Sequence, residues 1–405
     1  MAIRMDQIPA PAPRPCRPRI WLWLSLLAVF LAIGALAGGL FAGPQERSAD
    51  GHLWAGLALA ASAWATMSFS GLLAYVGKHQ VAQGWDDARQ LDIEQRQRCG
   101  RRSQQVLATS VLTPLRVGVD RDPARQLAGL QAGVPLLQSG APGMTPSEPA
   151  TLDSLEEAVA TAMASVLRDL AASLALLPAE QPLALSLSID SGIEAPELAV
   201  MWRRAWRDSG IRQSATMLDG AGLAVLDHWL DWRIADPALL MLVALRFSPS
   251  SLEGGAQTSA GLLLGNRLTQ TGLAPLAYLH RPEQQRGDTP EALRDAINQA
   301  LDWVPLAATA IQRIWLAGTT QRYQPISTAL SHSPLGQDGS ASRHCLDTVL
   351  GTAAVSAWLA VAAAAQSIQA GEGAQFILSG EDAAPTGLWC TVVTPVPPAG
   401  EKDIK

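Results

Sequence analysis

Lysine is nearly absent from this sequence of 405 residues, which contains only Lys78, Lys402 and Lys405. The stretch from His79 to Glu401 therefore has none. A phosphate-binding P-loop and a Schiff-base cofactor site each need a lysine inside the folded domain. The sequence argues against both kinds of site, and we expect no cofactor.

Cysteine is also scarce. The four cysteines are Cys16, Cys99, Cys345 and Cys390, and no pair of them has the spacing of metal ligands. His344 stands next to Cys345, but this adjacency does not match a zinc-binding spacing. We expect free thiols in a reducing compartment and no metal site.

The chain also has no excess of basic residues over acidic ones. The formal net charge is −6, and no basic stripe is visible in the part of the chain that follows the apolar N-terminal runs. These features argue against nucleic acid as a partner. With 48% apolar residues, a chain of this length can bury one large core or two joined cores.

Two long runs near the N-terminus carry no charge, one from Ile20 to Gly43 and one from Leu53 to Gly77. A spanning helix needs about 20 apolar residues. A signal peptide is the main alternative for the first run, but its apolar core would be only about 7–15 residues long. The two runs therefore predict a transmembrane hairpin over residues 20–77.

The basic residues that flank the hairpin predict its orientation. Four arginines precede the first run, one lies in the loop between the runs, and six basic residues follow the second run up to position 102. The positive-inside rule then places both ends in the cytoplasm. We expect a two-pass protein of the bacterial inner membrane, with a disordered basic tail at 1–19 and a charged stalk at 78–105.

The composition changes after the stalk to that of a layered α/β domain. Apolar strands, such as the run from Ala238 to Phe247, alternate with amphipathic helices. Thr289 and Pro290 predict the start of one such helix, and an alanine-rich run from Ala353 to Ala365 predicts a central helix. We expect a first half at 106–250, a second half at 251–397 and a tail at 398–405.

Several short motifs follow the order found in the beta-ketoacyl synthases of the thiolase superfamily. Asp219 to Val225 resembles the turn and helix that carry the nucleophilic cysteine, and Glu253 to Ala256 resembles the opening of the second half. Ala317 to Leu330 resembles the His-Gly-Thr-Gly-Thr turn, and Thr348 to Trp358 resembles the Gly-His-x-x-Gly-Ala-Ala segment. The resemblance covers residues 106–396 and implies a thiolase-like layered α/β domain of two related halves.

The catalytic side chains of those enzymes are missing at the matching positions. Gly222 stands where the cysteine would be, and Ala317 and Thr348 stand where the two histidines would be; His344 is near but offset. Glycine offers no nucleophile, and neither alanine nor threonine replaces an imidazole at an oxyanion. We therefore expect a degenerate site with no catalytic residues and a protein that is not an enzyme.

The layout as a whole resembles the type VI secretion lipase-adaptor proteins, which have N-terminal membrane segments and a large α/β domain without an obvious active site. This resemblance implies an adaptor that brings a phospholipase effector, its protein cargo, to a secretion spike protein. The alternative is a divergent acyl-transfer (condensing) enzyme that acts on acyl-CoA or acyl-carrier thioesters. Asp219 is the nearest ionisable residue to the vacant position at Gly222.

Overall fold

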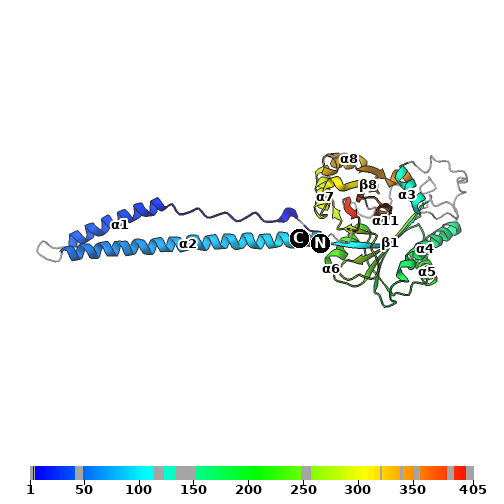
Figure 1. The fold of residues 1–405 in the computed structure, drawn as a ribbon, viewed down its shortest axis with the longest axis horizontal. Coiled ribbons are helices and arrows are strands. Elements are labelled where there is room, and N and C mark those ends of the chain that lie inside the picture. Colours follow the sequence, from blue (N-terminus) through cyan, green and yellow to red (C-terminus); the bar gives the residue numbers. More distant parts are fainter. Residues whose placement is uncertain are drawn as a thin grey trace. The chain divides into compact units, whose positions relative to one another are not determined.

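The computed structural model describes residues 3, 5–41, 49–113, 123–133, 152–247, 257–319, 322–337, 341–350, 356–380 and 387–397. The chain divides into two compact units (Figure 1). One comprises residues 4–96, and the other comprises residues 97–405 together with the first three residues.

Two helices dominate the unit of residues 4–96: α1 (Ile20–Phe41) and α2 (Ala49–Gly100). Both are long and apolar enough to cross a membrane, judged by length and composition. They pack closely because glycines face each other, and a Cβ on Gly34 or Gly56 would collide with the backbone of the other helix. Trp64 Nε1 also donates to the Trp23 carbonyl oxygen at 2.9 Å. The apolar hairpin inferred from the sequence is present as two candidate membrane spans.

The charged stalk is a continuation of α2, which runs without a break to Gly100. At 1.5 Å per residue, the part of α2 beyond Gly77 is about 35 Å long. The N-terminal tail, expected to be disordered, contains the 3-10 turn η1 (Met5–Gln7) and lies partly along this helix. The Ala12 amide donates to Asp86 Oδ1 at 2.9 Å, and Trp85 Nε1 donates to the Ala10 carbonyl at 3.1 Å.

A single mixed sheet organises the unit that follows the stalk. Its strand order is β3-β2-β4-β5-β1-β6-β11-β10-β8-β9, with β7 paired to β11. The strands are β1 (Ser103–Leu112), β2 (Leu183–Asp190), β3 (Ala215–Met217), β4 (Leu239–Arg246), β5 (Thr258–Asn266), β6 (Ala277–His280), β7 (Glu283–Gln284), β8 (Ile311–Ala317), β9 (Ser342–Cys345), β10 (Ala374–Ser379) and β11 (Trp389–Thr394).

The sheet consists of two halves with the same topology. In the first half, β3, β2 and β4 are parallel, β5 is antiparallel to β4, and β1 is antiparallel to β5. In the second half, β9, β8 and β10 are parallel, and β11 and β6 repeat the two antiparallel steps. The halves join where β1 pairs antiparallel with β6. This duplication confirms the predicted α/β fold of two related halves.

Helices cover both faces of the sheet. The helices of the first half are α3 (Pro123–Ala132), α4 (Leu152–Leu174), α5 (Ala195–Asp208) and α6 (Gly222–Trp232). Those of the second half are α7 (Pro290–Asp302), η3 (Ala308–Ala310), α8 (Tyr323–Ser331), α9 (Pro334–Gln337), α10 (Leu346–Leu350) and α11 (Ala357–Gln369).

Three apolar cores fill the spaces between helices and sheet. One inner core joins both halves and contains α3, α6 and α11; one outer core lies under α4 and α5, and another lies under α7 and α8. Figure 1 shows α11 in the middle of the domain. Residues 357–365 of α11 are all buried, and the alanines among them let the helix lie against the sheet. The predicted alanine-rich central helix is confirmed.

The main differences from the predicted elements lie at the ends of the sheet and near α11. The sequence did not indicate the edge strands β3 and β9, which are only three and four residues long. The predicted central helix is α11, which begins after its N-cap Ser356, and a separate short helix, α10, which the sequence did not indicate, ends at Leu350. Parts of three predicted motifs lie outside the described residues. They are the motif from Glu253 to Ala256, position 320 in the turn after β8, and the first residues of the alanine-rich run.

Candidate functional site

The two halves each present the carboxyl ends of parallel strands, which is where open α/β sheets usually bind ligands. In the first half, α6 begins shortly after β3. In the second half, a turn leaves the end of β8 beside α10. All three positions predicted from the condensing enzymes fall on these two segments.

Gly222, the position predicted to match the nucleophilic cysteine, is the first residue of α6. Its φ of 58° is in the left-handed region, and Gly220 two residues before has a φ of 113°. A residue with a Cβ pays a steric cost of about 1–2 kcal/mol in this conformation. The turn is therefore built around glycine, and the helix start carries no side chain that could attack a substrate.

Ala317 is the last residue of β8 and is fully buried in the inner core. Its carbonyl accepts a hydrogen bond from the Gly380 amide at 2.9 Å. A Cβ on Gly380 would collide with the carbonyl oxygen of Gly318, so the turn lies tightly against the end of β10. The methyl side chain of Ala317 has no hydrogen-bond donor or acceptor that could take the place of an imidazole.

A buried carboxylate holds the turn after Ala317. Asp347, on α10, accepts hydrogen bonds from the Gly318 amide at 2.8 Å and the Thr319 amide at 2.6 Å. These backbone donors are therefore already engaged by a carboxylate. No local sequence pattern indicated this role, because Asp347 lies 28 residues from the nearer amide.

Thr348 follows Asp347 on α10 and is exposed. The structure thus brings two of the predicted positions, Ala317 and Thr348, together through the Asp347 bridge. Leu223, the residue after Gly222, packs in the same inner core as Ala317. Asp219 is exposed in the turn before α6.

His344 lies on β9 with its ring 5.5 Å from that of Trp315, measured between centroids. Arg313 Nη1 lies 2.6 Å from His344 Nε2, and the same guanidinium forms two contacts with Glu372 at 2.7 and 3.1 Å. Burial, followed by the Arg313 charge, lowers the pKa of His344. The imidazole is therefore neutral at neutral pH. His344 pairs with Trp315 of β8, two residues before Ala317.

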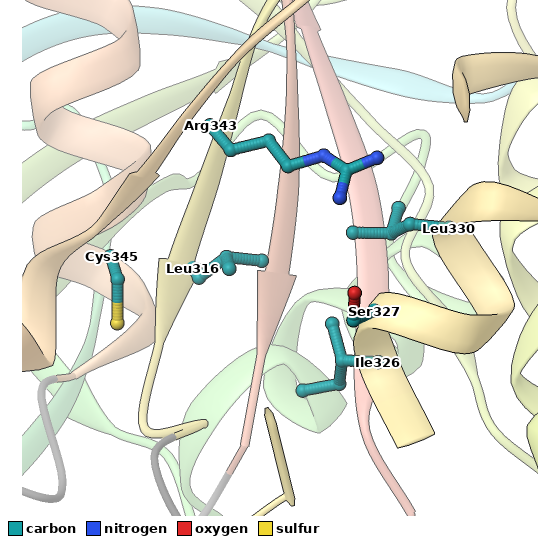
Figure 2. A pocket seen from close by; sticks show the side chains of 6 residues that line it. All are labelled: Leu316, Ile326, Ser327, Leu330, Arg343 and Cys345. Atoms are coloured by element: carbon teal, nitrogen blue, oxygen red, sulfur yellow. The ribbon is translucent and has the colours of Figure 1, made fainter. Parts of the chain in front are cut away.

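A small hollow lies on the outer face of the second half, between α8 and the strands β8 and β9 (Figure 2). It is lined by Leu316, Ile326, Ser327, Leu330, Arg343 and Cys345. Within the described ranges, no group of three or more His, Cys, Asp or Glu side chains lies close enough together to hold a metal ion.

Neither a family model nor a curated protein sequence matches the chain. Solved structures do match it. A type II polyketide ketosynthase in complex with its acyl-carrier protein has a TM-score of 0.50 at 10% identity, and covers 73% of this chain and 100% of its own. The ishigamide ketosynthase/chain length factor has a TM-score of 0.49 at 15% identity, over 73% of this chain and 99% of its own.

Human mitochondrial 3-ketoacyl-CoA thiolase in complex with CoA has a TM-score of 0.45 at 8% identity, over 73% of this chain and 99% of its own. The fold class is thiolase-like, or ketosynthase-like, as the sequence resemblance implied. At these identities the likeness shows the fold and does not show an activity.

One expectation needs correction. The sequence led us to expect that the protein is not an enzyme, and the comparison contradicts this, because the similar structure with a TM-score of 0.50 is a ketosynthase. The inference relied on three replaced side chains. That inference did not consider that a fold of this kind can carry other reactive side chains at the same strand ends.

Proposed function

We propose that this chain is a membrane-tethered adaptor whose thiolase-like domain binds a protein cargo. One observation carries the proposal. The N-terminal part of the chain contains two helices that are long and apolar enough to cross a membrane, and a folded α/β unit follows the second of them, the 52-residue α2. A tether of this kind keeps a domain, together with any protein that it binds, near a bilayer.

We further propose that the chain crosses the bacterial inner membrane twice and that the α/β unit lies in the cytoplasm. The distribution of arginine and lysine around the two apolar runs supports this orientation. The cargo in this proposal is a phospholipase effector destined for a type VI secretion spike, and support for it comes from the sequence resemblance to lipase-adaptor proteins.

Affinity purification of the full chain from membranes in a mild detergent, followed by mass spectrometry, tests the adaptor function. We expect one protein to co-purify in a stable, near-stoichiometric complex. Absence of any stable partner would contradict the proposal. Genes for a lipase and a spike protein beside the gene for this chain would support the identity of the cargo.

Acyl transfer is the second candidate function, and the shared fold with a ketosynthase favours it. The left-handed turn at Gly222, directly before α6, is also consistent with a site built at a helix start. In this alternative the domain binds acyl-CoA or acyl-carrier thioesters, and Asp219 is the nearest ionisable group to the helix start.

Acyl transfer predicts that the purified chain binds and turns over acyl-CoA, and that Asp219→Ala lowers the rate by at least about tenfold, a loss of roughly 1.4 kcal/mol of transition-state stabilisation. Asp208→Ala, which removes an exposed acid on α5, is the matched control. A full chain that neither binds nor turns over any acyl-CoA or acyl-carrier thioester would rule out the candidate.

A further inference from the structure

Strand β9 is one end of the large sheet. In the part of the chain that the structure describes, it pairs on one side only, with β8. Ser342 and Arg343, its first two residues, are exposed. An edge strand presents backbone donors and acceptors that can pair with an added strand from another chain.

The side chains of β9 alternate between the two faces of the sheet. His344 lies against Trp315 on the inner face. Arg343 and Cys345 line the outer hollow instead, together with side chains of α8 (Figure 2). A strand added beside β9 would therefore direct every second side chain to the same outer face as the hollow.

The hollow combines an apolar floor with a cationic rim. Leu316, Ile326 and Leu330 supply the apolar surface. Figure 2 shows the Arg343 side chain extending from β9 across the hollow toward Leu330. Within the described residues no hydrogen bond or ion pair engages its guanidinium, whereas Arg313 on neighbouring β8 is held by Glu372.

We propose that β9 is the docking edge for an extended, acidic segment of a protein partner. The segment adds as a further strand, places an apolar side chain in the hollow, and places a carboxylate against the Arg343 guanidinium. Arginine suits this role because its planar fork binds a carboxylate through two parallel hydrogen bonds. That this partner is the cargo rests on the adaptor function proposed above. The proposal that β9 binds an acidic strand does not depend on that function.

A titration of the full chain in detergent with defined peptides tests the docking edge. The probe is a fluorescent strand-forming peptide of alternating threonine and valine, in which one valine is replaced by leucine and the next by glutamate. One matched peptide has lysine in place of glutamate, and another is N-methylated at alternate amides so that it cannot pair as a strand. Fluorescence anisotropy measures the dissociation constants.

We expect the glutamate peptide to bind, and both matched peptides to bind at least about tenfold more weakly, a difference of ~1.4 kcal/mol. Arg343→Glu should reverse the preference, so that the lysine peptide becomes the tighter ligand. Arg204→Glu makes the same charge change on an exposed α5 side chain of the first half, and should leave all three affinities within about twofold.

Equal binding of the glutamate and lysine peptides, equal binding of the N-methylated peptide, or equal effects of the two arginine variants would each overturn the docking edge. A cargo that co-purifies equally well with the Arg343→Glu chain would also overturn it, and would leave the adaptor function intact. If no cargo is found at all, the adaptor function fails, while the peptide titration still decides whether the edge binds acidic strands.

Discussion

Asp347 shows how much one buried side chain can organise. Its two carboxylate oxygens accept from consecutive amides of the turn after β8, and the side chain is 3% exposed. These two hydrogen bonds hold the residues after Ala317 beside α10. We infer that this carboxylate positions the turn in either of the candidate functions.

Replacing Asp347 by alanine should leave both turn amides without this acceptor. Because each unsatisfied buried donor costs about 1–3 kcal/mol, we expect Asp347→Ala to lower the free energy of unfolding by about 2–4 kcal/mol. Thr348→Ala, at the exposed neighbouring position, should change it by less than about 0.5 kcal/mol. Urea denaturation of both variants is the measurement, and equal effects would show that the bridge is unimportant.

His280 gives the protein a predictable response to acid. Burial, together with the nearby Arg267 charge, lowers the pKa of His280 from 6.5 to about 4. Between these values the unfolded chain binds more protons than the folded one, so the free energy of unfolding falls as the pH falls from 6.5 toward 4. A shift of this size corresponds to about 3 kcal/mol.

We expect His280→Gln to remove most of this pH dependence. Glutamine can still form a hydrogen bond with Thr394, whose hydroxyl lies 3.0 Å from His280 Nε2. Unfolding free energies at several pH values between 4 and 6.5, in both chains, give the two slopes. Identical slopes would mean that His280 does not titrate as inferred. Asp227 and Glu283, whose pKa values are raised by burial, are present in both chains. The difference between the two slopes therefore gives the contribution of His280 alone.

At the scale of elements, a buried ionic cluster joins α6 to the end of β6 and to the last turn of α2. The Arg281 side chain is 1% exposed, and its Nη2 lies 2.6 Å from Oδ1 of both Asp227 and Asp231. Its Nη1 donates to the Cys99 carbonyl at 3.3 Å. Residues 97–100 consequently belong to the same compact unit as the sheet.

Trp303 completes this junction. Its ring lies so close to Gly100 that a Cβ there would collide with it, and its Nε1 donates to Glu283 Oε1 at 2.9 Å. Any larger residue at position 100 would push the last turn of α2 away from the ring. Residues 97–100, the last turn of α2, are therefore held against the sheet domain by a specific fit.

Removing the cation from this junction should be costly, because the buried Asp227 carboxylate would lose the Arg281 guanidinium that contacts it. We expect Arg281→Ala to lower the free energy of unfolding by about 3–5 kcal/mol. Arg204→Ala, which removes an arginine whose side chain is 83% exposed, should cost less than about 0.5 kcal/mol. Thermal or urea unfolding of the full chain in detergent compares the two, and a small effect at Arg281 would contradict the inferred role.

At the scale of the whole molecule, the orientation proposed for the two apolar helices can be measured. Cys16 precedes the first helix and is exposed. In intact cells, a chain with Cys16 as its single cysteine should resist a membrane-impermeant maleimide. A chain whose single cysteine is introduced by Ser48→Cys, between the two helices, should be labelled. The reverse pattern would place the domain outside the cytoplasm.

The elements that could be predicted were those with a strong local pattern. The apolar runs beginning at Ile20 and Leu53 indicated both N-terminal helices, and the run from Ala238 to Phe247 indicated the strand now seen as β4. Thr289 was recognised as an N-cap, and its hydroxyl accepts from the Ala292 amide at 3.2 Å. The short strands β3 and β9 carry too few residues for any such pattern.

The sequence by itself determined which side chains stand at Gly222, Ala317 and Thr348, and it determined the layered fold, because alternation and apolar runs are local properties. Only the tertiary structure decided that Asp347 holds the turn after β8, that Arg281 joins α6 to the last turn of α2, and that Arg343 rims a hollow beside a sheet edge. Such contacts join residues far apart in the chain, and they depend on strand order and register, which no local pattern contains.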